Sequence, residues 1–224
     1  MLLALDTSTR IAGVALFHEG ALLDECTWRS ELNHTTELGP VVAAMLARQS
    51  VVARGLDAIA VAIGPGSFNG LRVGVSMAKG MSQALGIPVV GIDTLELLAY
   101  QQRHFRGLIR PILGAGRAQV ATAQFRSFRG KWRCTEDDHL STMEEIIAGT
   151  SRRTLFCGEI SAASASQLAL ALGGHAVLAG EVASWRRAGF LAQLANERLQ
   201  AGHADQADTL EPVYLRRPSI GGVP

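Results

Sequence analysis

The order of strand-like and helix-like segments along the chain is the feature that most restricts its fold. Three apolar segments typical of strands come first and are separated only by short turns, at residues 2–5, 12–17 and 21–28. Helices and strands then alternate, with a helix expected at 35–49, a strand at 58–63, a helix at 68–85, a strand at 89–92 and a helix at 95–103. Short turns favour antiparallel pairing, whereas strands joined through helices pair in parallel.

The same order of elements begins again near residue 106. A second set of strands is expected at 108–113, 119–125 and 131–135, followed by a helix at 143–148, a strand at 154–157 and helices at 162–172 and 185–199. No residue-level repeat accompanies it, so the duplication is one of architecture. We therefore predict an α/β protein of two related lobes, residues 1–105 and 106–224, each with a mixed sheet, a strand meander and flanking helices.

Charge and hydrophobicity exclude several classes of protein. Hydrophobic residues make up 48% and charged residues 18% of the 224 positions, which is enough for a real core. The formal net charge of +1 predicts no strongly basic field that would hold nucleic acid to this chain alone. Three basic pairs are interpreted as solvated surface arginines, at Arg152-Arg153, Arg186-Arg187 and Arg216-Arg217.

Cysteine usage and the N-terminal residues favour a reduced, cytoplasmic location. The three cysteines are widely spaced and form no CxxC, so neither a disulfide framework nor a thiolate metal site is indicated. The first residues lack a basic lead and reach Asp6 after a short apolar run, unlike a signal peptide. No apolar run is long enough to cross a bilayer, so no membrane association is expected.

Common catalytic motifs are missing from the sequence. The six histidines form neither HExxH nor HxxxH, which argues against a metal pair on a helix. The surroundings of Ser67 do not match GxSxG, and the glycines before it do not match GxxxxGK[ST]. The residues therefore predict no metal site and no activated nucleophile.

Two turns could still meet an anion. The first follows the opening strand, where an aspartate can hold hydrated magnesium while hydroxyls and N–H groups meet phosphates; its residues are Asp6, Thr7 and Ser8. The second precedes the helix at 68–85, where glycines allow close backbone approach to a phosphate; its residues are Gly64, Gly66 and Ser67. The alternative for the first is a hydrogen-bonded hairpin turn, and for the second a strand-to-helix turn with a serine cap.

The helices at about 34–49 and 68–85 carry more apolar surface than one sheet face requires. The second of them is apolar on two flanks, one of which is rich in glycine and methionine. We interpret these helices as a partner-docking surface made of Leu38, Val42, Met45, Gly70, Val73, Gly74, Met77 and Met81. The alternative is a helix wedged between the sheet and its neighbouring helix, which would bury both flanks without any partner.

Several motifs together resemble the TsaB (YeaZ) family over nearly the whole chain. They are Leu3-Ala4-Leu5-Asp6-Thr7-Ser8-Thr9, His34, Gly64-Pro65-Gly66-Ser67-Phe68-Asn69-Gly70-Leu71-Arg72-Val73-Gly74, Ile87-Pro88-Val89-Val90-Gly91-Ile92 and Pro212-Val213-Tyr214-Leu215-Arg216. Asn69 stands where the family usually has threonine, and the turn from Gly114 to Arg117 replaces a more acidic one. The resemblance implies an actin/Hsp70/sugar-kinase fold.

The resemblance also implies a function and partners. TsaB-like proteins are subunits of the bacterial machinery that makes N6-threonylcarbamoyladenosine at position 37 of transfer RNAs reading ANN codons. They pair with the catalytic paralogue TsaD, to which the ATPase TsaE is recruited. TsaD-like proteins carry a metal-binding HxxxH whose histidines align with Thr94 and Leu98 here. We therefore expect a non-catalytic scaffold that binds TsaD, forms a homodimer when TsaD is absent, and meets tRNA, ATP or ADP with Mg²⁺ only within the complex.

Two other functions remain open on sequence alone. An active ATPase or phosphotransferase would use Asp6 and the turn from Gly64 to Gly70, and it would need a second carboxylate facing Asp6. A stand-alone nucleotide sensor would bind ATP tightly without a partner.

Overall fold

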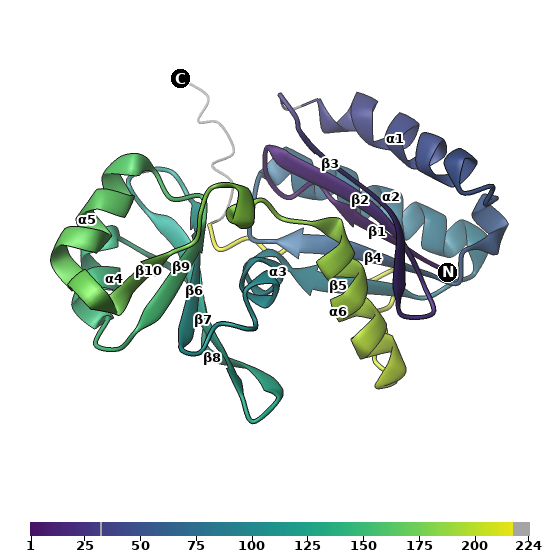
Figure 1. The fold of residues 1–224 in the computed structure, drawn as a ribbon. Helices are drawn as coiled ribbons and strands as arrows, with labels where there is room; N and C mark the ends of the chain where they lie inside the picture. Colours follow the sequence, from purple (N-terminus) through teal and green to yellow (C-terminus); the bar gives the residue numbers. More distant parts are fainter. Residues whose placement is uncertain (32, 217–224) are drawn as a thin grey trace, which may run out of the picture.

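The computed structural model describes residues 1–31 and 33–216, and it contains two five-stranded mixed sheets (Figure 1). The first sheet has the order β3-β2-β1-β4-β5, from β1 (Leu2–Asp6), β2 (Ile11–His18), β3 (Ala21–Arg29), β4 (Ala58–Gly64) and β5 (Val89–Asp93). The second has the order β10-β9-β6-β7-β8, from β6 (Leu108–Gly114), β7 (Val120–Phe128), β8 (Lys131–Ser141), β9 (Thr154–Gly158) and β10 (Ala176–Leu178).

The two sheets share one topology. In each, the first three strands form an antiparallel meander, and the fourth strand pairs in parallel with the first. The fifth strand then pairs in parallel with the fourth. This repeat confirms the predicted two-lobed fold of the actin/Hsp70/sugar-kinase type, although no strand was expected at β10, which is only three residues long.

Both faces of the first sheet are covered by helices. Along β1, Leu3 and Leu5 pack toward α1 (His34–Arg48) and α2 (Phe68–Leu85), whereas Leu2 and Ala4 pack toward α6 (Ala188–Gln200). This arrangement explains why β1 is apolar throughout, because a strand buried on both faces does not alternate with polar residues. Figure 1 shows α6 on the opposite side of the first sheet from α1 and α2.

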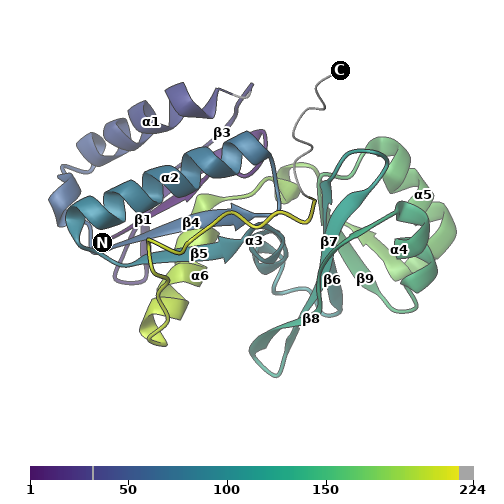
Figure 2. The same ribbon diagram turned by 180° about the vertical axis from the view of Figure 1, so that it is seen from behind.

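The last helix and the C-terminal segment return to the first lobe. The core of α6 packs on β1 and β2, and the backbone N–H of Asp205 donates to the carbonyl of Val89 on edge strand β5. Figure 2 shows this segment, in yellow, running along the first sheet toward the second lobe. The prediction that residues 106–224 form a C-terminal lobe and tail assigned α6 to the second lobe, whereas α6 packs on the first, because the apolar face of β1 and β2 needs the cover that α6 supplies.

The second lobe is covered by α4 (Met143–Gly149) and α5 (Ala162–Leu172) on one face. Helix α3 (Thr94–Gln101) lies between the lobes: Leu97 packs with the first-lobe core, and Leu95 and Leu98 pack with the second. The turn at 114–117 is held by Arg216, whose guanidinium donates to the Ala115 carbonyl oxygen at 2.9 Å.

Local capping follows the sequence closely at two helices. Ser67 accepts a hydrogen bond from a backbone N–H in the first turn of α2, which is the serine-cap alternative, and Asp93 does the same in α3. Helix α1 begins at His34, where a start at residue 35 was expected, and α6 begins at Ala188 instead of residue 185 because Trp185 and Arg187 are extended. Among the described residues, no helix has both the length and the apolar character that spanning a membrane requires.

Candidate functional site at the interlobe cleft

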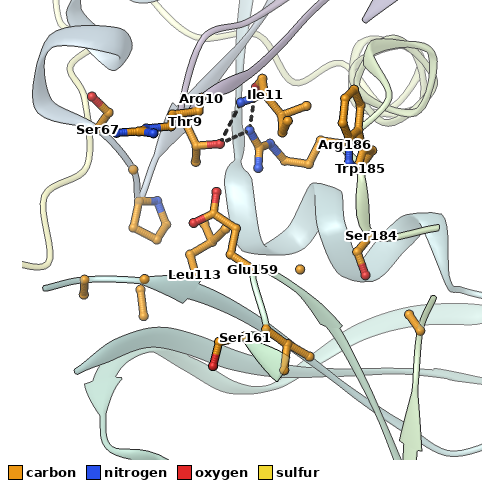
Figure 3. A pocket seen from close by; sticks show the side chains of 18 of the residues that line it. Thr9, Arg10, Ile11, Ser67, Leu113, Glu159, Ser161, Ser184, Trp185 and Arg186 are labelled. Carbon is orange, nitrogen blue, oxygen red and sulfur yellow. Dashed lines mark hydrogen bonds between the residues drawn. The ribbon is translucent and has the colours of Figure 1, made fainter. Parts of the chain in front are cut away.

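A cleft of about 930 Å³ separates the two lobes. It opens where the carboxyl ends of β1 and β4 face those of β6 and β9, the edge at which parallel strands commonly place ligand sites. Figure 3 shows Thr9, Arg10 and Arg186 on the first-lobe side, opposite Glu159 and Ser161 of the second lobe.

Asp6 ends β1 beneath this cleft, and its carboxylate is fully engaged by the chain itself. Oδ1 accepts hydrogen bonds from the Ser8 N–H at 2.8 Å and the Ser8 hydroxyl at 2.6 Å. Oδ2 accepts from Nε of Arg186 at 2.8 Å, and both charged side chains are only 2% exposed. Asp6 is therefore one half of a buried ion pair.

Arg186 ties the link before α6 to the end of β1. Its terminal nitrogen Nη2 donates to the Thr9 hydroxyl and to the Ile11 carbonyl, each at 2.7 Å (Figure 3). The interpretation of Arg186 as a solvated surface residue is therefore wrong. An arginine can be buried here because Asp6 supplies the opposite charge and two further acceptors satisfy its donors. No local feature of the sequence distinguishes Arg186 from Arg187, its neighbour in the basic pair, which is exposed.

The glycines that begin α2 are required by close packing on the Asp6 turn. A Cβ on Gly66 would overlap the carbonyl oxygen of Ser8, and one on Gly70 would overlap that of Thr7. Hydrogen bonds fix the approach: the Ser67 N–H donates to the Ser8 carbonyl at 2.6 Å, and the Thr7 hydroxyl donates to the Gly70 carbonyl at 2.7 Å. The two turns singled out from sequence thus form one packed unit.

Gly64 has a different role. Its φ of +121° lies in the region that favours glycine, and a Cβ there would overlap the carbonyl oxygen of Val213. The Val213 N–H donates to the neighbouring Ile63 carbonyl at 2.7 Å, so the C-terminal segment lies directly against the end of β4. Gly64 therefore accommodates the chain's own backbone.

The predicted docking surface needs correction. Five of its eight residues are buried inside the lobe and cannot form an outer face: Leu38, Val42, Met45, Gly70 and Gly74. They pack on the sheet or on the Asp6 turn, as expected for the alternative in which the helix is wedged against the sheet and its neighbouring helix. The remaining three, Val73, Met77 and Met81, are half-buried at the edge of this core.

A shallow groove of about 410 Å³ separates the outer surfaces of α1 and α2. Val73 and Met77 form its apolar floor, and Thr35 and Arg72 also line it. We call this feature the α1–α2 groove.

The ionisable groups of the described residues form no cluster of three that could hold a metal ion. None of the described residues lining the cleft is a histidine or a cysteine. Burial raises the pKa of the Cys157 thiol to about 12, and burial lowers the pKa of His34, whose ring packs beside Gly70. Thr94 and Leu98 are almost fully buried in α3.

Comparison with known proteins identifies the family. The family model described as "TsaD: tRNA N6-adenosine threonylcarbamoyltransferase" matches residues 29–220. The "tRNA threonylcarbamoyladenosine biosynthesis protein TsaB" of Bacillus subtilis is 32% identical, with 96% of this chain and 93% of the relative covered. The chain belongs to the TsaB family.

Other members of the TsaB family agree with this result. The protein of the same name from Haemophilus influenzae is 29% identical over 96% of this chain and 93% of its own length. The solved structure "YeaZ from Pseudomonas aeruginosa" superposes with a TM-score of 0.79 at 26% identity and covers 96% of this chain and 99% of that one. A second Pseudomonas structure, with a TM-score of 0.80 and 27% identity over 96% and 99% of the two chains, is titled as similar to "peptidase YEAZ".

Proposed function

We propose that this chain is a non-catalytic, partner-binding subunit of the bacterial machinery that makes threonylcarbamoyladenosine in transfer RNA. Its membership of the TsaB family supports a place in that pathway. On this proposal it works in the cytoplasm, pairs with the catalytic paralogue TsaD, meets TsaE through that complex, and forms a homodimer when TsaD is absent. Any ATP or ADP with Mg²⁺ binds only in the assembled complex.

The buried pair of Asp6 and Arg186 carries the proposal. An active phosphotransferase would need an accessible carboxylate for hydrated magnesium and a second carboxylate facing it. Here the group that faces Asp6 is a cation, and both Asp6 oxygens already accept hydrogen bonds. Magnesium does not fit at this carboxylate unless Arg186 is displaced. Breaking the buried ion pair in this way would cost about 3–5 kcal/mol of stability.

The surroundings of the cleft support the same reading. The Ser67 N–H, which could otherwise meet a phosphate, donates to Ser8. Serines line the cleft, but no histidine is among its described lining residues. These serines therefore lack the neighbouring base that a serine peptidase uses. Thr94 and Leu98, where TsaD-like proteins would carry metal-binding histidines, cannot replace imidazole ligands.

The α1–α2 groove is the proposed docking site. It is apolar at its floor and flanked by polar side chains, as expected for a partner-binding surface. A charge placed at Met77 would have to be desolvated on docking, whereas the free subunit would leave it in water. Met77→Arg should therefore weaken association by about 3 kcal/mol, which is roughly 150-fold, without unfolding the chain.

The experiment compares Met77→Arg with Ala44→Arg, an equal change at an exposed position of α1 away from the groove. We would measure TsaD binding by calorimetry, self-association by analytical ultracentrifugation, and threonylcarbamoyl transfer by the reconstituted proteins. Met77→Arg should lose all three, and Ala44→Arg should lose none. The double variant Asp6→Asn/Arg186→Met should stay folded and keep TsaD binding and transfer.

The opposite pattern would support the enzymatic rival. If Asp6→Asn/Arg186→Met stays folded and binds TsaD but abolishes transfer, while Met77→Arg retains both, the subunit uses Asp6 in chemistry and the proposal is wrong.

A further inference from the structure

The hairpin that joins β7 to β8 has an unusual composition. Residues 126–133 read Arg-Ser-Phe-Arg-Gly-Lys-Trp-Arg, with four cations, two aromatic residues and no acid. Among the ion pairs of the described residues, none involves these four cations. Figures 1 and 2 show the hairpin loop projecting from the second lobe beyond the rest of the molecule.

The strand register separates the hairpin side chains onto two faces. Arg126 is paired with Arg133, and Phe128 with Lys131, so these four side chains share one face of the two-stranded ribbon. Trp132 lies on the other face and stacks on Phe125, with ring centroids 5.5 Å apart and an interplanar angle of 3°.

Trp132 anchors the hairpin to the body of the protein. Besides stacking on Phe125, it meets the ring of Tyr100 edge to face at 5.6 Å. Since this inner face is fixed to the core, the opposite face points outward: Phe128 is 46% exposed, and Lys131 and Arg133 are exposed. We call this outward face, with Arg129 at the turn, the basic hairpin face.

Two features of the basic hairpin face oppose the stability of the free protein. Arg126 and Arg133 place like charges directly opposite each other across the ribbon, which is unfavourable. Arg129 has a φ of +52° in a two-residue turn where asparagine or aspartate is favoured over arginine. Both features concentrate positive charge. A bound polyanion would relieve the repulsion between Arg126 and Arg133 and would contact Arg129 at the turn.

The exposed ring of Phe128 is flanked by cations. The guanidinium carbon of Arg126 lies 4.5 Å from the ring centroid, and that of Arg129 lies 5.3 Å from it. An accessible aromatic ring beside positive charges is the arrangement on which an unpaired base stacks while its phosphates meet the cations.

The basic field continues around the same end of the second sheet. The starts of β6 and β9 lie at this end because they run antiparallel to β7, and the segments leading into them are also basic. Eight of the chain's 21 lysines and arginines, and none of its 20 acids, fall within residues 103–108, 125–134 and 151–154: Arg103, Arg106, Arg126, Arg129, Lys131, Arg133, Arg152 and Arg153. The net charge of +1 therefore conceals an uneven distribution, in which the basic segments lie next to the acidic residues 136–138 of β8.

We propose that the basic hairpin face binds RNA directly, with its arginines on phosphates and Phe128 stacked on an unpaired base. This inference rests on the proposed function for the nature of the RNA, a transfer RNA. RNA is favoured over an anionic membrane because the hairpin exposes one aromatic ring and no aliphatic side chain to insert between lipids. Seven of the eight cations are arginines, which suit phosphate recognition.

The test measures binding of an unmodified ANN-reading tRNA transcript to the full chain, alone and with TsaD, by fluorescence anisotropy over a range of salt concentrations. Arg126→Gln/Arg133→Gln should weaken binding about tenfold or more and reduce the slope of log K against log salt by about 1.5. Phe128→Leu, which keeps an apolar side chain but loses the ring, should weaken binding by roughly 5-fold or more with little change in slope.

The matched control is Arg54→Gln/Arg117→Gln, which removes the same charge from exposed positions outside the three basic segments. It should bind RNA like the parent chain. An equal loss in the control and the hairpin variants would overturn the inference, and so would displacement of RNA by vesicles of equal phosphatidylcholine and phosphatidylserine. Hairpin variants that bind RNA normally, combined with a Met77→Arg variant that loses TsaD, would refute this inference alone and leave the proposed function standing.

Discussion

Replacing Arg186 by methionine would test whether the ion pair with Asp6 is a structural element of the fold. The guanidinium donates three hydrogen bonds of 2.7–2.8 Å, and both partners of the ion pair are 2% exposed, so solvent does not screen them. Arg186→Met would leave the Asp6 carboxylate buried with only its Ser8 donors. The free energy of unfolding should fall by about 3–5 kcal/mol.

Urea denaturation followed by circular dichroism would measure this loss. At roughly 3 kcal/mol per molar urea, the midpoint should shift by about 1 M or more. Arg187→Met is the matched control, because Arg187 is adjacent in sequence but 56% exposed in its pair with Glu25. Because the Arg187 guanidinium is exposed, solvent screens its attraction to Glu25 more than it screens the Asp6–Arg186 pair, so the midpoint should shift less in the control.

A double variant separates the ion pair from packing. Asp6→Asn/Arg186→Met removes both charges while keeping an acceptor for Ser8, and it should lie within about 2 kcal/mol of the parent. The reasoning is refuted if Arg186→Met costs no more than Arg187→Met, or if Asp6→Asn adds to its cost instead of restoring stability.

Two further predictions concern α2 and the boundary between the lobes. Gly70→Ala should destabilise the chain by about 1–3 kcal/mol because its Cβ meets the Asp6 turn, whereas Gly80→Ala, which meets nothing within 4 Å, should stabilise by about 0.5–1 kcal/mol; thermal denaturation of both measures this. Burial and the hydrogen bond with Asp138 raise the pKa of Asp93 well above its ordinary value, so protonated Asp93 contributes stability at acidic pH that is lost as pH rises through the raised pKa. Asp93→Asn should therefore gain stability relative to the parent between pH 4 and pH 8 in urea titrations, and a difference independent of pH would contradict this.

The fold was predictable because its determinants are local. Short turns between 2–5, 12–17 and 21–28 impose antiparallel pairing, and helices between later strands impose parallel pairing, so the order of elements implied both sheets except for β10. The caps at Ser67 and Asp93 were predictable for the same reason, since each side chain bonds to an N–H three residues on. The resemblance to the TsaB family was likewise carried by contiguous motifs.

The candidate site depended on contacts that no local pattern encodes. The partner of Asp6 lies 180 residues away, and an arginine in a basic pair has no feature that distinguishes a buried from a solvated position. The glycines of α2 suggested a phosphate turn or an interface, and only the approach of Ser8 and Thr7 shows that they accommodate the chain's own backbone.

Tertiary structure also decided where apolar and charged surfaces lie. Residue periodicity predicts that α1 and α2 are amphipathic, but burial by the sheet removed Leu38, Val42 and Met45 from the outer surface and left Val73 and Met77 at a groove. Net charge gave no sign of a basic face, because three segments distant in sequence meet at one end of the second sheet. Element type follows from residue periodicity within a window, whereas burial and charge pairing are set by which distant segments the fold brings into contact.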